Sequence, residues 1–198
     1  MERQRCAWAY ETSPHEIAYH DTEWGVPAYG ERQLFEMLIL EGAQAGLSWR
    51  TILDKREGYR RAFAGFDPEQ MIRFSPERRA ELLLDAGIVR NRLKIDASFS
   101  NASALLALRD RGVDLAGYLW GFVDGQSVHN HWREPADVPV TTPASEAMSR
   151  DLKRCGFRFV GPTICYAFMQ AVGMVNDHLI GCFRHAEISA GATRAKPT

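Results

Sequence analysis

Helix-start signals recur along almost the whole chain, and they constrain the fold more than any other feature of the sequence. Ser48 precedes an amphipathic stretch, Ser75 is followed by Pro-Glu, and Asp114 and Thr142 stand before further helical segments. Side-chain oxygens at such positions accept hydrogen bonds from the free N–H groups of a first helical turn. Alternating runs of β-branched residues, which would indicate strands, are few. The sequence therefore predicts an all-α fold.

The length of the chain, 198 residues, allows a substantial buried core. We expect a single helical domain over residues 1–185, with room for two lobes, and a disordered tail over 186–198. The prolines and polar residues of 125–143 predict a long surface loop. We find no internal repeat, P-loop or dinucleotide-binding glycine pattern, so those nucleotide-binding classes are excluded.

The formal net charge of -1 excludes a grossly basic nucleic-acid binder but leaves room for local basic patches. Such clusters are most often solvated helix faces. No apolar run approaches the roughly 18 residues of a membrane helix, and the first residues lack a hydrophobic signal core. We therefore expect a cytoplasmic monomer with no membrane partner. The basic clusters are Arg50, Lys55, Arg56, Arg60 and Arg61; Arg90, Arg92 and Lys94; and Lys153, Arg154 and Arg158.

Two cysteines and two histidines near the chain ends suggest a metal site. In the segment NDHLIGC, His178 and Cys182 are four residues apart and would share one face of a helix. Cys6 and His20 near the N-terminus supply two more ligands of the same types. Two thiolates and two imidazoles fill a tetrahedral Zn²⁺ shell and leave no position for water, so this zinc would be structural. It would join the two ends of the chain.

The alternative is that these histidines and cysteines are unrelated, because the two pairs are far apart in sequence. His129 and His131 compete as ligands but are expected at the surface, and Cys155 and Cys165 are expected to fill core space. A catalytic zinc of the nucleobase deaminase kind is excluded: only His15 is directly followed by glutamate, and no Cys-x-x-Cys is present.

One carboxylate, Glu41, ends a strongly apolar run, where its charge is expensive to desolvate. By itself such a residue is most often a surface or helix-end carboxylate, and Trp49 beyond it is most often core. The stretch 82–95 predicts a helix, a glycine-containing turn and a second helix. That turn can point N–H groups at a phosphate, although an ordinary helical hairpin has the same pattern.

Five segments spread along the chain carry long motifs. In order they are CAWAY at 6–10, IAYHDTEWGVP at 17–27, LFEMLILEGAQAGLSW at 34–49, DAGIVRNRLKI at 85–95 and GFRFVGPTICYAFMQAVGMVNDHLIGC at 156–182. Together they resemble the type I 3-methyladenine DNA glycosylases of bacteria. The resemblance spans nearly all of the chain from Cys6 to Cys182. It implies an all-α fold of the helix-hairpin-helix DNA glycosylase superfamily.

The same resemblance implies one structural zinc that joins the N- and C-terminal segments, with Cys6, His20, His178 and Cys182 as ligands. It also implies the partners and the reaction. The substrate is double-stranded alkylated DNA, the flipped base is released as free 3-methyladenine, and an abasic site remains.

The base pocket also follows from the resemblance. Glu41 lines it and is the residue expected to act in catalysis, Trp49 stacks on the damaged ring, and Tyr19 contacts its edge. Trp8 and Trp24 belong to the same aromatic neighbourhood. The catalytic aspartate common in the superfamily is missing from this family, and nothing in the sequence restores it, so we nominate no general base.

The DNA contacts implied by the resemblance lie in two segments. Gly46 and Leu47 match the loop that fills the gap left in the duplex, and residues 86–94 match the hairpin that clasps the phosphate backbone. The turn departs from the usual pattern in having one glycine rather than two, with a bulky Leu93 nearby. The hairpin residues expected to contact DNA are Gly87, Arg90, Arg92 and Lys94.

Physical chemistry gives Glu41 a reason to be there. Adenine methylated at N3 is a cation whereas adenine is neutral, so a buried carboxylate and an indole face both favour the damaged base. Two alternatives remain: a zinc-stapled DNA-binding or damage-sensing module without activity, and a hydrolase with a catalytic zinc. Release of bases from methylated DNA would distinguish an enzyme from the inactive module. Removal of the metal by a chelator would test for a catalytic zinc.

Overall fold

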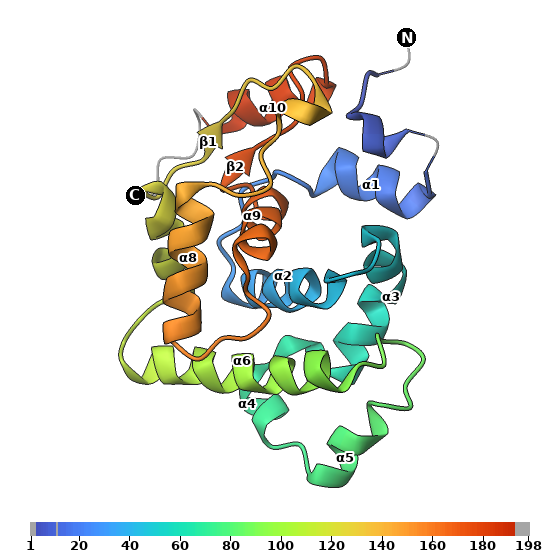
Figure 1. Ribbon diagram of the computed structural model, residues 1–198, viewed down its shortest axis with the longest axis vertical. Coiled ribbons are helices and arrows are strands. Elements are labelled where there is room, and N and C mark those ends of the chain that lie inside the picture. The colour runs from blue at the N-terminus through green and yellow to red at the C-terminus, as the bar shows by residue number, and fades with distance from the viewer. Residues whose placement is uncertain (1–2, 11, 193–198) are drawn as a thin grey trace.

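Helices make up most of this computed structural model, which describes residues 3–10 and 12–192 (Figure 1). The all-α expectation is confirmed for the bulk of the described chain. The α-helices are α1 Pro14–Thr22, α2 Glu31–Gln44, α3 Trp49–Ala62, α4 Pro68–Ile72, α5 Pro76–Glu81, α6 Arg92–Asp110, α7 Leu115–Trp120, α8 Pro143–Arg154, α9 Pro162–Ala171 and α10 Phe183–Ala192. Short 3-10 helices are η1 Ala7–Ala9, η2 Ala64–Phe66, η3 Gly121–Val123 and η4 Pro135–Asp137.

The helix starts lie where the capping residues predicted them. Ser48 accepts a hydrogen bond from the N–H of Thr51, so α3 begins at Trp49. The side chains of Ser75, Asp114 and Thr142 cap α5, α7 and α8 in the same way. Each cap satisfies one N–H group that the helix itself leaves unpaired.

Helix α2 occupies the middle of the molecule (Figure 1). Every residue from Leu34 to Ala43 is buried, because α3, α6, α7 and α9 pack around it. A helix that is covered on all sides is apolar all round, which explains the LFEMLIL run. The carboxylate of Glu41 is therefore carried into the interior by the most buried helix of the fold.

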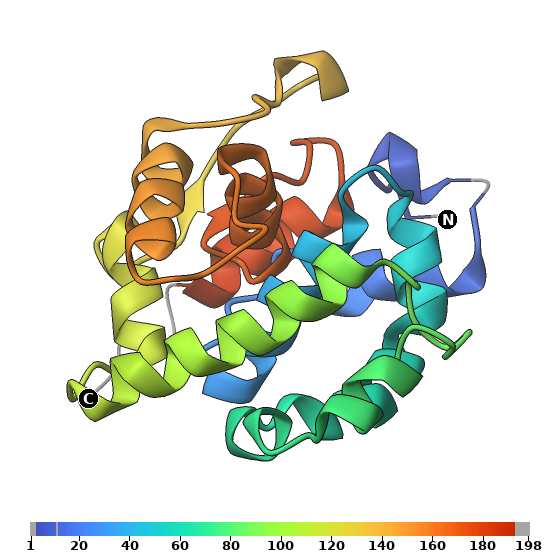
Figure 2. The same cartoon turned by 60° about the horizontal axis from the view of Figure 1, so that its bottom comes forward.

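Helix α5 precedes the glycine-containing turn, and α6 follows it and runs across the molecule (Figure 2). Helix α5 ends at Glu81, six residues before Gly87, where the sequence suggested a stop. The turn packs closely on α3: a Cβ on Gly58 would lie 2.0 Å from the carbonyl oxygen of Gly87. Only glycine at position 58 permits this approach. Lys55 on the same helix donates from Nζ to the carbonyl oxygen of Ala86 at 2.6 Å.

The segment 125–143 is more ordered than a plain surface loop. It contains β1 Val128–His129, which pairs in parallel with β2 Val175–Asn176, and it also contains η4. Val128 lies opposite Val175 and His129 opposite Asn176. Strands of two residues are too short to show an alternating pattern, which is why no sequence pattern predicts them.

The C-terminal part of the chain corrects the expectation of a disordered tail over 186–198. Helix α10 continues to Ala192 and buries Ile188; residues 193–198 lie outside the described part. The N-terminal segment lies beside α10: the N–H of Phe183 donates to the carbonyl oxygen of Gln4 at 2.9 Å. The segment around Gln4 and the start of α10 are therefore adjacent. No described helix is long and apolar enough to cross a membrane.

Candidate active site and metal centre

Glu41 lies in the last turns of α2 with only 4% of its surface exposed. Burial raises the pKa of its carboxyl group to about 8, because the charged form loses its hydration. Among the described residues, no hydrogen bond or ion pair reaches this carboxylate. A buried anion without an internal partner is costly, so its position suits a site where a ligand supplies the partner.

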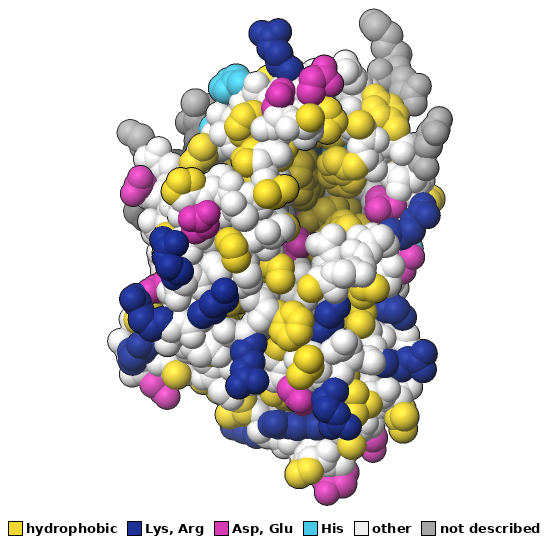
Figure 3. Space-filling model, in the orientation of Figure 1, with side chains coloured by type: hydrophobic (Ala, Val, Ile, Leu, Met, Phe, Trp, Pro, Cys, Tyr) yellow, Lys and Arg dark blue, Asp and Glu magenta, His cyan; other side chains and the backbone are white. Residues whose placement is uncertain are grey.

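A cavity of about 280 Å³ opens beside this carboxylate. Figure 3 shows a hollow with hydrophobic walls on this face, in the region of α1 and α9. The cavity lies at the small end of the range for ligand pockets, as expected for a single flat ring. Its walls bring together all five residues that the sequence assigned to the base: Tyr19, Glu41, Trp49, Trp8 and Trp24.

The aromatic rings of the pocket pack in two pairs. The rings of Tyr19 and Trp49 are 5.4 Å apart and tilted by 47°, and those of Trp8 and Trp24 meet edge to face at 5.2 Å. The Tyr19 hydroxyl and the Trp49 Nε1 are buried without a hydrogen-bond partner. Burial raises the pKa of Tyr19 well above its usual range, and the negative charge of Glu41 is the second cause. Tyr19 therefore remains a neutral hydrogen-bond donor.

Four further residues line the cavity that sequence reasoning missed: Glu16, Gln44, Ala167 and Gln170. Gln44 follows Glu41 by three positions on α2, so helical periodicity alone would place the two on one face. Gln170 is one polar residue in an apolar helix, α9, and no local pattern shows that it faces the cavity.

The loop between α2 and α3 stands at the rim of the pocket, because Gln44 before it and Trp49 after it both line the cavity. Gly46 has a φ of 77°, a left-handed conformation that glycine adopts without strain. The side chain of Leu47 is 40% exposed at the tip of this loop. The structure therefore places an exposed leucine in the loop at the rim of the pocket.

The hairpin residues expected at DNA differ in their surroundings. Arg90 and Arg92 are exposed. The N–H of Gly87 donates to the carboxylate of Asp85 at 2.7 Å, so that donor is already engaged. Lys94 is half-buried, and its Nζ donates to backbone carbonyl oxygens at the end of α2.

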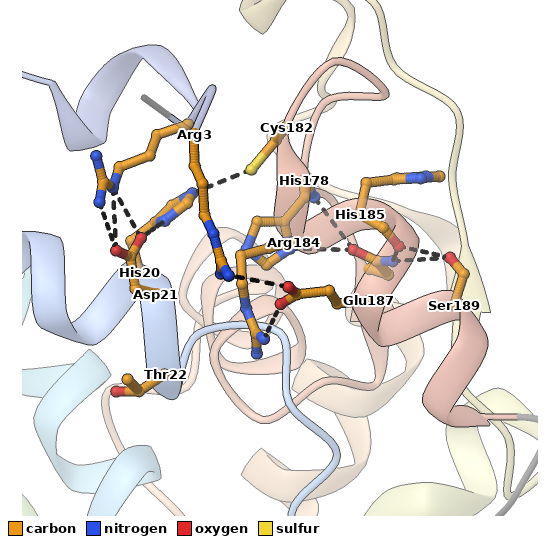
Figure 4. Close-up of polar contacts among 12 residues, drawn as sticks. Arg3, His20, Asp21, Thr22, His178, Cys182, Arg184, His185, Glu187 and Ser189 are labelled. Carbon is orange, nitrogen blue, oxygen red and sulfur yellow. Dashed lines mark hydrogen bonds and ion pairs between the residues drawn. The ribbon is translucent and has the colours of Figure 1, made fainter. Parts of the chain in front are cut away.

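The predicted metal ligands also converge. The ligand atoms of Cys6, His20 and Cys182 all lie within 4.8 Å of one another, and all three residues are buried. His20 Nε2 lies 3.4 Å from the sulfur of Cys182 (Figure 4). The two thiols interact: a hydrogen bond from Cys6 lowers the pKa of Cys182 and raises that of Cys6. A thiolate beside a thiol and an imidazole is the donor set that zinc prefers.

His178 is the fourth predicted ligand, and its ring lies 5.0 Å from that of His20, between centroids. Its Nδ1 contacts the amide oxygen of Asn176 at 3.1 Å, which leaves a buried Nε2 without a partner. His20 likewise engages Asp21 through Nδ1 at 2.8 Å. Ligating histidines are usually held in this way through their second nitrogen. Cys6, His20 and Cys182 could therefore hold a metal ion together, and His178 lies beside them but outside the group whose ligand atoms are within 4.8 Å of one another.

The local structure around these ligands differs from the helix that the spacing suggested. The segment from His178 to Cys182 is irregular, and α10 begins only at Phe183. His131 is exposed as expected, whereas His129 is half-buried and contacts Asn176. Among the described residues, one cluster of cysteine, histidine or carboxylate side chains has ligand atoms close enough to hold a metal ion. It consists of Cys6, His20 and Cys182.

The helical fold and the buried aromatic pocket define a DNA glycosylase, as comparison with known proteins shows. Residues 8–185 match the model of the methyladenine glycosylase family, and the chain belongs to that family. The DNA-3-methyladenine glycosylase 1 of Escherichia coli (strain K12) is 48% identical over 179 residues, which cover 90% of this chain and 95% of that protein. The DNA-3-methyladenine glycosylase of Haemophilus influenzae is 43% identical over 178 residues, covering 90% and 96%.

Solved structures show the same likeness. A crystal structure of a 3-methyladenine DNA glycosylase I is 52% identical, superposes with a TM-score of 0.89, and matches 91% of this chain and 98% of its own. A structure of the 3-methyladenine DNA glycosylase I of Staphylococcus aureus, which describes how that protein recognises 3-methyladenine, is 33% identical. It superposes with a TM-score of 0.86 and matches 90% of this chain and 95% of its own. The expected family is confirmed, as is a mostly helical fold shared with its solved members.

Proposed function

We propose that this protein hydrolyses the N-glycosidic bond of 3-methyladenine in alkylated double-stranded DNA and leaves an abasic site. The observation that carries the proposal is the buried, unpartnered carboxylate of Glu41 in an aromatic pocket. The names of the relatives support it. Solved relatives include a tyrosine-to-phenylalanine variant with bound 3-methyladenine and a glutamate-to-glutamine variant. The replaced residues are of the same types as Tyr19 and Glu41.

Recognition of the damaged base follows from charge. At about 4 Å and an effective dielectric constant near 20, the carboxylate and the cationic ring attract by about 4 kcal/mol before desolvation, and an uncharged adenine gains no such attraction. The exocyclic amine donates to the same carboxylate. Trp49 stacks on the electron-poor ring, an arrangement that an indole face favours.

The reaction demands little acid catalysis, because the leaving base becomes neutral as the C–N bond breaks. A water oxygen bonds to the sugar carbon, the base departs with the electron pair of the bond, and the water proton passes to solvent. The chain's residues hold the extruded base and favour the positive charge of the oxocarbenium-like sugar. Glu41 is the residue that lies in contact with this positive charge.

DNA is held by two surface features. Leu47 fills the space that the flipped nucleotide leaves, which offsets part of the few kcal/mol that flipping costs. Arg90 and Arg92, both exposed at the start of α6, contact phosphates and give affinity that falls with salt. The positive end of the α6 dipole adds to this attraction, and Asn91 Oδ1 accepts the N–H of Lys94 there.

A structural zinc held by Cys6, His20, His178 and Cys182 completes the proposal. When bound, the ion supplies four coordinate bonds that tie the N-terminal segment to the start of α10. The donor set is closed, so no water is activated there and base release depends on the pocket alone. We further place residues 1–185 in a single monomeric domain that acts in the cytoplasm.

Methylated duplex DNA tests the proposal directly. The native protein should release free 3-methyladenine, and Glu41→Gln should lose nearly all release while keeping its fold. Glu57 is an exposed carboxylate on α3, with 69% of its side chain accessible, so Glu57→Gln is the matched control and should keep full activity. Binding of methylated duplex without any base release would favour the damage-sensing module instead.

A further inference from the structure

Gln170 stands between two hollows. It lies in the last turn of α9 and lines the base pocket together with Glu41. It also lines a second cavity of about 280 Å³ that contains Asp177, and the two cavities share Trp8 and Trp24 as walls. One amide side chain therefore reaches both spaces.

Asp177 holds one end of this amide. The carboxylate is 3% exposed, and its Oδ2 accepts hydrogen bonds from the Gln170 Nε2 at 2.8 Å and the Tyr166 hydroxyl at 2.6 Å. Its Oδ1 accepts from Asn130 Nδ2 at 2.7 Å and Trp132 Nε1 at 2.8 Å. Four donors use the four lone-pair positions of a carboxylate, so the group is saturated and rigidly held.

This contact fixes the direction of the Gln170 amide. Only the NH₂ group can donate to the carboxylate of Asp177, and a rotation by 180° would place the carbonyl oxygen against Oδ2. With Nε2 engaged by Asp177, Oε1 is the amide atom left to accept a hydrogen bond. Gln170 lines the base pocket, so a residue of its wall carries an acceptor whose orientation Asp177 sets.

We propose that Gln170 is a specificity-determining residue, whose Oε1 accepts one N–H of the exocyclic amine of the flipped base while Glu41 accepts the other. This inference rests on the proposed function. The amine at C6 of adenine carries two hydrogens, so two acceptors can both be satisfied. Guanine has an oxygen at C6, which would face both acceptors without a hydrogen between them.

The expected consequence is selection of 3-methyladenine over 3-methylguanine. Both bases are cationic, so the charge of Glu41 alone does not separate them. A buried acceptor left unpaired costs the full loss of its hydration, which makes a polar pocket far more selective than an apolar one. The fixed amide of Gln170 supplies that second, orientation-dependent acceptor.

Gln170→Met tests the inference, because methionine keeps the length and helix preference of glutamine but removes the carbonyl oxygen. The substrate is duplex DNA that carries both 3-methyladenine and 3-methylguanine, and kcat/KM is measured for each released base. We expect release of 3-methyladenine to fall about 10-fold and release of 3-methylguanine to hold or rise. The ratio of the two should therefore fall by about 10-fold or more.

Trp132→Phe and Tyr166→Phe are matched controls. Each removes one donor from Asp177 and leaves Gln170 in place, so a purely structural effect through Asp177 would lower the ratio in them as well. We expect both to keep the native ratio. An unchanged ratio in Gln170→Met, or an equal loss in the two controls, overturns the inference.

Two further outcomes are decisive. If Gln170→Met and Gln170→Ala both fail to fold, as judged by thermal unfolding, the residue is structural and the inference is wrong. If the native protein releases neither base from methylated DNA, the proposed function fails instead. Failure of the proposed function is therefore distinguishable from failure of this inference.

Discussion

Lys94 in the first turn of α6 donates from Nζ to the carbonyl oxygen of Ala45, at 2.6 Å, in the loop that carries Leu47. The same nitrogen donates to the carbonyl oxygen of Ala43 at 2.8 Å. These carbonyls end α2, where the negative end of the helix dipole favours a cation. The hairpin and the base pocket are therefore joined by one ammonium group, and Lys94 positions the loop beside Glu41.

Lys94→Met should release this loop. Loss of two charge-assisted hydrogen bonds lowers the free energy of unfolding by about 1–2 kcal/mol, and base release falls because Leu47 is no longer held at the pocket rim. Base release sampled at fixed times measures the loss of activity, and urea unfolding measures the loss of stability. DNA affinity should keep its salt dependence, because the ammonium faces protein oxygens.

Arg92→Met provides the contrast, since Arg92 is exposed at the first position of α6. We expect unchanged stability, uniformly weaker DNA binding and a salt slope reduced by about 1. If Lys94→Met behaved like Arg92→Met, Lys94 would be a phosphate ligand and its positioning role would be wrong.

The burial of Glu41 predicts how stability depends on pH. The pKa is about 8 in the folded protein against 4.5 when solvated, so between these values the folded state holds a proton that the unfolded state has lost. Stability therefore falls as pH rises through this window, and the penalty is fully expressed above pH 8. Glu41→Gln removes the penalty.

Urea unfolding at pH 4 and pH 9 measures this difference. At pH 4 the two proteins should be about equally stable, and at pH 9 Glu41→Gln should be more stable by on the order of 4 kcal/mol. Equal stability at both pH values would mean that the carboxylate is solvated rather than buried.

The same carboxyl group controls activity with the opposite sign. Only the ionised form attracts the cationic base, so kcat/KM for 3-methyladenine should rise with pH and level off above about 8, the pKa of the free protein. The Glu41→Gln variant should show a flat profile at its low residual rate. A native profile that is flat from pH 6 to 9 would remove the titration of Glu41 from the mechanism.

Much of the pocket follows from local patterns in the sequence. Ser48 and the apolar run before Glu41 fix one helix start and one buried helix, and these two elements bring Trp49 and Glu41 to the same cavity. Capping and burial depend on near neighbours along the chain, which is why such features are readable without coordinates.

The parts that the sequence did not reveal depend on contacts between distant segments. The Gln170 amide donates to Asp177, and two loop residues, Asn130 and Trp132, donate to the other oxygen of that carboxylate. The strand pairing of Val128 with Val175 joins the same two regions. The irregular turn that carries Cys182 also departs from helical spacing, since tertiary contacts override local periodicity there.

The zinc proposal predicts a metal-dependent fold. Elemental analysis of the purified protein should find one zinc ion per chain, and a chelator should lower the melting temperature before any direct effect on chemistry, because four coordinate bonds join the chain ends. His178→Ala should lose zinc, since its Nε2 is buried without a hydrogen-bond partner and its ring lies 5.0 Å from that of His20. His131→Ala, at an exposed histidine outside the ligand group, is the control and should keep both zinc and melting temperature. If His178→Ala kept a full equivalent of zinc, the zinc shell would close without this imidazole. If a chelator stopped base release at an unchanged melting temperature, the ion would be catalytic rather than structural.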